Sequence, residues 1–261
     1  MGNIKSKLKS YAPWFVHYAY RKLRALPEDL PVILPFLFKN TKTSTRFTDR
    51  LGLVYQCYRI SYSIDCPHME NEIVRVMGAI FAADSKTPGV VVEAGSYKGG
   101  SGAKLSRAAA LANRKLYLFD SFEGIPEHRE THGKNIYGGD AYFPPGSYRG
   151  SLEEVQKTIR TFGDLSPCVF VKGWFDDTMP KFTEPIIAAY IDVDLLSSTR
   201  TCITYLYPLL VAGGKLFSQD GHLPWAITLL NDDSFWKTLH TKKPRMTGLG
   251  MKKLVEITKG L

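Results

Sequence analysis

The chain has 261 residues, of which 44% are hydrophobic and 23% charged; this is the composition of a globular protein and argues against a disordered one. Its four cysteines, at positions 57, 66, 168 and 202, form no CxxC pair. That spacing argues against a disulfide scaffold and a zinc knuckle, and it favours a reducing, cytoplasmic compartment.

The formal net charge of +9 is concentrated near the N-terminus. Residues 1–50 hold ten Lys and Arg against three acids, whereas the rest of the chain holds 24 against 22. A nearly neutral body argues against nucleic-acid binding, because that function needs clustered cations on the folded surface.

The basic N-terminal segment also contains five aromatic residues: Tyr11, Trp14, Phe15, Tyr18 and Tyr20. Cations beside amphipathic rings suit a lipid headgroup interface, so residues 1–38 predict either peripheral membrane contact or a helical arm. Such an arm would pack on its own domain or on a second subunit of a homo-oligomer. The longest apolar run, Pro31–Phe38, is too short to span a bilayer, and the start has no apolar segment typical of a cleaved signal peptide.

We expect residues 1–68 to form a basic, aromatic-rich N-terminal extension with helical character, and residues 69–261 to form the main domain. Pro27, Pro31 and Pro35 should break any helix between the two. The segment between them and the main domain, residues 39–50, is polar and rich in Ser and Thr, which predicts a connector loop.

In the main domain, helical periodicity and β-branched runs alternate along the chain. The pattern predicts helices at 69–83, 101–112 and 199–210, and strands at 89–94, 115–120, 168–171, 185–192, 215–218 and 251–258. Ser151 and Glu154 form a capping box that begins a further helix. Gly213-Gly214 predicts a turn, and residues 121–150, which have no period, predict a lid-like loop. The alternation indicates an α/β fold with a mostly parallel sheet flanked by helices.

Several predicted strands end on polar residues: Glu93 and Gly95, Asp120, Asp192, and Gln219 with Asp220. Ligands of parallel sheets bind beyond the carboxyl ends of the strands. One such acid could merely cap a strand or a helix, but four such ends at a common edge predict a shared site.

The turn after the first strand is rich in glycine. Gly95 allows a sharp turn, and Gly99 and Gly100 let a ligand approach the backbone at a helix start. Asp120 is placed to accept hydrogen bonds from ribose hydroxyls. The spacing is not the dinucleotide GxGxxG, and Glu93 would repel a diphosphate but suit a cationic sulfonium. These features favour S-adenosylmethionine over NAD.

Five ordered motifs, EAGSYKGGSGAKLS, FDSFEGIPE, KGWFDDTMP, IDVDLLSST and YPLLVAGGKLFSQDGH, resemble the macrocin O-methyltransferase (TylF-type) family over roughly residues 70–222. The resemblance implies a Rossmann-like class I methyltransferase fold with S-adenosylmethionine as methyl donor. It also implies a magnesium-assisted methylation of a hydroxyl, often on a sugar or another small molecule.

By position, the resemblance implies three groups of donor-binding residues. Those at the methionine part are Glu93, Ala94, Gly95, Ser96 and Tyr97, beside the glycines at 99 and 100. Those at the ribose are Asp120, Ser121, Phe122, Glu123 and Gly124, and those near the adenine are Ser151, Trp174 and Phe175.

The implied metal ligands are Asp192, Gln219 and Asp220. The family usually has two adjacent acids where this chain has Gln219-Asp220, and a Gln carbonyl oxygen can ligate Mg²⁺ but supplies no charge. We therefore expect either a weaker metal site or none. In the latter case Gln219 would orient Asp220 through a hydrogen bond.

A hydroxyl acceptor needs a metal or a base to remove its proton. Asp192 is the first candidate and His222 the second, although His222 could instead be an exposed loop histidine. Asp194 is expected to cap the helix that starts at 197–199. The long loop also carries His128, His132, Tyr137 and Tyr142, which could close over the acceptor.

Two other functions stay open. A nicotinamide-dependent oxidoreductase would share the fold but should contain the diphosphate-compatible GxGxxG, which this chain does not have. A non-catalytic or membrane-associated binding protein could retain the methyltransferase fold without the metal site, and Gln219 favours it. Whether the donor co-purifies with the protein would separate these alternatives from the enzyme.

Overall fold

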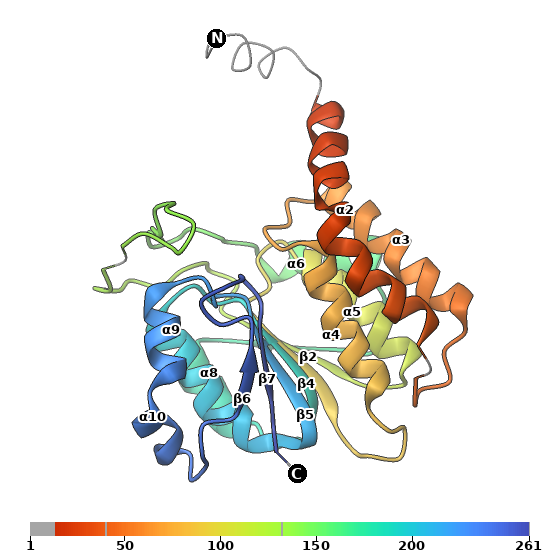
Figure 1. The fold of residues 1–261 in the computed structure, drawn as a ribbon. Coiled ribbons are helices and arrows are strands. Elements are labelled where there is room, and N and C mark those ends of the chain that lie inside the picture. The colour runs from red at the N-terminus through yellow and green to blue at the C-terminus, as the bar shows by residue number, and fades with distance from the viewer. Residues whose placement is uncertain (1–13, 40, 132, 261) are drawn as a thin grey trace, which may run out of the picture.

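The computed structural model describes residues 14–39, 41–131 and 133–260. A seven-stranded sheet with the strand order β3-β2-β1-β4-β5-β7-β6 forms its centre (Figure 1). The strands are β1 Val90–Ala94, β2 Leu116–Asp120, β3 Cys168–Lys172, β4 Ile186–Ile191, β5 Leu210–Ser218, β6 Arg245–Thr247 and β7 Val255–Thr258. Strands β1 to β5 are parallel, and β7 pairs antiparallel with both β5 and β6. The predicted mostly parallel α/β sheet is confirmed.

Helices cover both faces of the sheet (Figure 1). One face carries α2 Trp14–Phe38, α3 Phe47–Ser63, α4 Glu70–Ala82, α5 Gly100–Leu111 and α6 Leu152–Phe162. The other carries α7 Phe175–Thr178, the 3₁₀ turn η1 Met179–Lys181, α8 Leu196–Leu209, α9 Pro224–Asn231 and α10 Asp233–Thr238. Because neighbouring residues of a strand point to opposite faces, Val91 joins the first core and Val92 the second. Burial on both faces explains the unbroken apolar run of β1.

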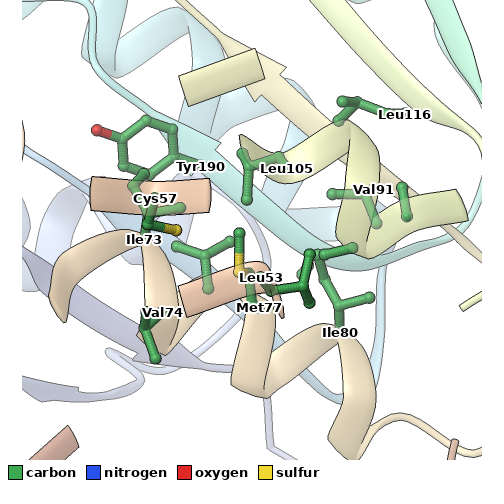
Figure 2. Packing of buried hydrophobic residues seen from close by; sticks show 14 of the residues in the cluster. Leu53, Cys57, Ile73, Val74, Met77, Ile80, Val91, Leu105, Leu116 and Tyr190 are labelled. Atoms are coloured by element: carbon green, nitrogen blue, oxygen red, sulfur yellow. The ribbon is translucent and has the colours of Figure 1, made fainter. Parts of the chain in front are cut away.

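The first core also includes the helices that precede residue 68. Leu53 and Cys57 of α3 pack against Met77 of α4 and Leu105 of α5 (Figure 2). The predicted helical extension is therefore helical in its described part, and from Ala25 onward it contributes buried residues to the structure. The leader residues 1–13 lie outside the described part. None of the described helices combines the length and apolarity needed to cross a bilayer.

The prediction that three prolines break the leader was wrong, because α2 continues through Pro27, Pro31 and Pro35. The prolines recur every four residues and all lie on the exposed side. The opposite side packs on α4 and contributes Ile33 and Phe36 to the core. Tertiary packing thus outweighs the hydrogen bonds that proline removes.

The predicted connector at 39–50 is also shorter than expected, because α3 begins at Phe47. The Asp49 carboxylate accepts a hydrogen bond from the Arg46 backbone N–H at 3.0 Å and satisfies that donor at the helix start. The predicted turn at Gly213-Gly214 lies within β5 instead. The pairing with β4 jumps there from Leu210 to Lys215, so the two glycines form a bulge.

The remaining predicted elements are confirmed with shifted ends. The capping box is present, since Ser151 Oγ accepts from the Glu154 N–H and the Glu154 carboxylate accepts from the Ser151 N–H. Helix α8 starts three residues earlier than predicted and β7 four residues later. Residues 121–150 contain no helix among their described members, and an isolated bridge between Lys134 and Asp140 is the strand pairing recorded there.

Gly95 allows β1 and β4 to end very close together. Its φ is +87°, and a Cβ there would lie 2.0 Å from the backbone oxygen of Asp192. Gly138 has a similar φ of +83° but nothing within 4 Å of the same position. Both positions therefore need a left-handed backbone, but only at Gly95 is there also no room for a side chain.

We predict that Gly138→Ala lowers the free energy of unfolding by about 1 kcal/mol, the cost of a left-handed alanine. Gly95→Ala should cost several kcal/mol more, because the backbone of β4 must move. Urea unfolding of both variants tests this. Equal losses for the two would contradict the close approach.

The sheet buries one carboxylate, that of Glu93 in β1, which is 0% exposed. The hydroxyls of Ser101 and Ser96 are its hydrogen-bonding neighbours, and they lower its pKa by less than burial raises it. Burial raises the pKa of Glu93 to about 8, and the charges of Asp120 and Asp192 act in the same direction.

The unfolded chain releases the Glu93 proton near pH 4.5, but the folded protein releases it only near pH 8. The free energy of unfolding should therefore fall as pH rises between these values. Glu93→Gln removes this contribution, so its stability relative to wild type should increase over that range by up to about 1.4 kcal/mol per pH unit. Denaturant unfolding at several pH values measures this, with exposed Glu184→Gln as control. Parallel curves for Glu93→Gln and wild type would disprove the assignment.

Candidate functional site

A cavity of about 470 Å³ lies at the carboxyl edge of the sheet. The predicted site residues that line it are Gly95, Ser96, Tyr97, Gly100, Asp120, Ser121, Gly124, Trp174, Phe175, Asp192, Gln219, Asp220 and His222. The structure therefore brings together residues that are more than a hundred positions apart in the sequence.

The other predicted site residues do not line this cavity. Glu93 and Ala94 are buried in β1, and Phe122 packs in the first core. Gly99 is the left-handed residue before α5, Glu123 is exposed, and Ser151 caps α6. These residues stay predictions as donor-binding residues.

Asp120 holds together the two loops at one end of the cavity. Its Oδ2 accepts a hydrogen bond from the Ser96 N–H at 2.6 Å, and its Oδ1 accepts from the Phe122 N–H at 2.7 Å. Burial raises the pKa of Asp120, while these two hydrogen bonds act in the opposite direction. Ser96 also presents a buried hydroxyl, which is a hydrogen-bonding neighbour of Glu93. This end therefore offers fixed polar groups to a ligand.

The wall beyond Asp120 is aromatic. Trp174 lies between β3 and α7, and Phe175 is the first residue of α7. The Gly173 N–H donates to the Asp120 backbone oxygen at 3.0 Å. Trp174 is 39% exposed, so its ring can still be covered by a ligand. A flat apolar wall next to a carboxylate suits the base and ribose of a nucleoside.

Three carboxylates form a cluster at the other end of the cavity. Oxygen atoms of Asp192, Asp194 and Asp220 all lie within 4.8 Å of one another. Burial raises the pKa of Asp192 to about 6 and that of Asp220 to about 8, and Asp194 also has a pKa well above its usual range. The charge of Asp192 adds to the shifts of the other two acids, and the charge of Glu72 adds to that of Asp192. The cluster therefore attracts either protons or a cation.

The prediction that Asp194 caps helix α8 was wrong. Leu195 is the residue before α8, and its side chain makes no capping hydrogen bond. Glu130 from the long loop does so instead, accepting hydrogen bonds from the N–H groups of Leu196 and Ser197 at 2.7 and 2.9 Å. Asp194, with φ +60°, is turned toward the other two acids.

Gln219 is held by residues outside the acid cluster. Its Nε2 donates to Glu72 Oε2 at 2.7 Å, and the Tyr190 hydroxyl lies 3.4 Å from its Oε1. The same hydroxyl lies 3.2 Å from Asp192 Oδ2. Gln219 thus connects α4 to the cluster, and the sequence had no signal for a contact with a residue 147 positions away.

His222 lies under the long loop. Its ring stacks on Tyr137 with centroids 5.9 Å apart, and its backbone oxygen accepts from the Ile136 N–H. Burial lowers the pKa of His222 to about 4, and the nearby ammonium of Lys253 adds to this shift. The alternative of a fully exposed loop histidine is wrong, because the residue is partly buried in the cavity wall. Lys253 also lines the cavity and had not been predicted.

The long loop contributes further lining residues, among them His128 and Phe143. Tyr142 is 77% exposed and is not part of the cavity lining, and His132 lies outside the described residues. The hydrogen bonds of Glu130 with α8 and of Ile136 with the His222 backbone hold the loop against the site. The predicted lid-like position of residues 121–150 therefore has specific anchors.

Known proteins share this sequence pattern. The pattern of the Macrocin-O-methyltransferase (TylF) family matches residues 70–230. The demethyldecarbamoylnovobiocin O-methyltransferase of Streptomyces niveus is 33% identical over 145 residues, which are 52% of this chain and 54% of that protein. The mycinamicin III 3''-O-methyltransferase of Micromonospora griseorubida is 30% identical over 147 residues, 52% and 57% of the two chains. The match thus spans about half the length of these relatives.

Solved structures share the fold. The O-methyltransferase NovP superposes with a TM-score of 0.67 at 19% identity, over 82% of this chain and 100% of NovP. The calicheamicin methyltransferase CalS11 gives a TM-score of 0.51 at 17% identity, over 82% and 93%. The family match covers more than half of the chain and includes the glycine loop and the acid cluster. The chain therefore belongs to the macrocin O-methyltransferase (TylF) family.

Proposed function

We propose that this protein is an S-adenosylmethionine-dependent O-methyltransferase whose acceptor is a hydroxyl of a sugar or glycoconjugate. The observation that carries the proposal is one cavity that has Asp120 and an aromatic wall at one end and a carboxylate cluster at the other. The names of its relatives support it, since they are O-methyltransferases of novobiocin, mycinamicin and rhamnosyl-tetracenomycin compounds.

The residues present fit the proposed donor. The donor carries a sulfonium and an ammonium group, and the acids around the cavity favour positive charge. Ser96 and the backbone at Gly95 and Gly100 offer contacts at the glycine loop. Trp174 and Asp120 would then face the adenine and the ribose. S-adenosylmethionine, when bound, supplies the methyl group that is transferred.

The acid cluster fits a divalent cation that prefers oxygen ligands. We assign Asp192, Asp194 and Asp220 as its ligands, with Asp194 in the place that the resemblance gives to Gln219. The amide of Gln219 is already engaged with Glu72 and Tyr190. A bound Mg²⁺ would supply a Lewis acid that lowers the pKa of the acceptor hydroxyl.

Within this proposal, Asp192 accepts the proton of the acceptor hydroxyl. Burial lowers the pKa of His222 to about 4, which makes His222 a weak base. His222 stays neutral at pH 7 and, with Tyr137 stacked on it, orients the acceptor. The anchored loop excludes water and holds the acceptor in line with the donor.

Asp120→Ala should weaken binding of S-adenosylhomocysteine at least ~10-fold, because it removes the ribose acceptor and releases the Ser96 and Phe122 amides. Calorimetry on the purified protein measures this, and Asp177→Ala, an exposed acid of α7, is the matched control. A protein that binds NAD and not S-adenosylhomocysteine would refute the proposed function.

Asp194→Asn and Asp220→Asn should each weaken Mn²⁺ binding to the donor-free protein by ~10-fold or more, because each removes a charged ligand. Gln219→Ala should weaken it much less. Paramagnetic resonance of free Mn²⁺ gives the affinity without any activity assay. Unchanged Mn²⁺ binding in Asp194→Asn would mean that Gln219, not Asp194, is the third ligand. Full methyl transfer in the presence of EDTA would mean that the reaction does not use the metal.

A further inference from the structure

Helix α2 has an apolar side that nothing in the described structure covers. Leu26, Leu30, Leu34 and Phe38 are between 39% and 68% exposed. Their spacing of four residues places them along one side of the helix. Three exposed prolines follow the same spacing beside them, and Glu28 is the one exposed charged residue between 25 and 38. A solvent-facing side would normally carry charged residues instead.

Helix α3 extends this apolar side. Phe47, Leu51 and Tyr55 repeat at four-residue spacing and are 42% to 64% exposed. The two helices run side by side (Figure 1), and the rings of Phe38 and Phe47 meet with centroids 5.3 Å apart. We call the exposed residues Leu26, Leu30, Leu34, Phe38, Phe47, Leu51 and Tyr55 the α2–α3 face. Continuous exposed apolar patches of this kind mark interaction surfaces.

The positive charge of the chain lies in the same segment. Lys39, Lys42 and Arg46 are exposed at the connection between α2 and α3. Residues 1–50 carry ten basic residues against three acids, whereas the rest of the chain is almost balanced. Arg46 is paired with Asp49 at 3.3 Å, which leaves the two lysines as cations with no acidic partner recorded.

This charge distribution decides between two occupants. A second copy of the chain would bring two cationic segments together, and their repulsion would oppose the pairing. An anionic lipid surface would instead neutralise the cations while the apolar side chains leave water.

We propose that the α2–α3 face docks the protein on an anionic membrane surface. The two helices would lie in the headgroup plane, with their apolar residues inserted and Lys39 and Lys42 near the lipid phosphates. This surface is formed by other residues than the cavity, so the inference is independent of the proposed reaction.

The test is sedimentation of the full chain with vesicles of phosphatidylcholine alone and of an equal mixture with phosphatidylglycerol. We expect binding to the mixed vesicles, weakened by high salt, and little binding to the neutral ones. Equal binding to both kinds of vesicle, or binding to neither, would overturn the proposal.

Two pairs of variants locate the surface. Leu34→Glu/Phe38→Glu should reduce binding to the mixed vesicles at least ~10-fold, whereas Leu111→Glu, a similarly exposed leucine of α5, should not. Lys39→Glu/Lys42→Glu should reduce it ~10-fold or more, and Lys157→Glu/Lys181→Glu much less. Circular dichroism checks folding, and the lysine variants decide the question if the first variant misfolds.

Unchanged vesicle binding in a folded Leu34→Glu/Phe38→Glu variant would contradict the proposed surface. Light scattering distinguishes the other occupant. A dimer that this variant dissociates, in a protein that ignores vesicles, would assign the α2–α3 face to a second copy and overturn the proposal.

Discussion

The site depends on carboxylates that a parallel sheet buries at one edge, where they repel each other. Oxygen atoms of Asp192, Asp194 and Asp220 lie within 4.8 Å of one another, and burial raises the pKa of each of them. The backbone contact of Gly95 with Asp192 joins this cluster to the glycine loop. A residue without a Cβ is therefore needed where the glycine loop meets the cluster.

Much of this edge could be predicted from the sequence, because the rule that applies to it is general. Parallel strands end at the same side of a sheet, so Asp120, Asp192 and Asp220 had to meet once the strands were recognised. Asp194 was missed because a local rule applied equally well. An Asp shortly before a helix is a common cap, and only the distant Glu130, which takes that role, leaves Asp194 for the cluster.

The N-terminal helices show the same limit in the fold. A rule about single residues says that proline ends a helix, and three prolines should end it with certainty. The buried side of α2, with Ile33, Phe36 and Leu37, instead adds enough apolar contact to keep the helix intact. The placement of Pro27, Pro31 and Pro35 on the outer side follows from this, since the ring of proline then contacts solvent rather than the core.

Gln219, where the chain departs from the two adjacent acids usual in the family, has a physical explanation in Glu72. The two side chains lie 2.7 Å apart in a buried place, and burial already raises the pKa of Glu72. A carboxylate at position 219 would add a like charge in direct contact, whereas the amide donates a hydrogen bond.

The amide oxygen of Gln219 faces Tyr190, whose hydroxyl also lies near Asp192. The series Glu72, Gln219, Tyr190 and Asp192 therefore links helix α4 to the cluster. Position 219 has no carboxylate, but its hydrogen-bond partner Glu72 has one. The third carboxylate of the cluster is that of Asp194.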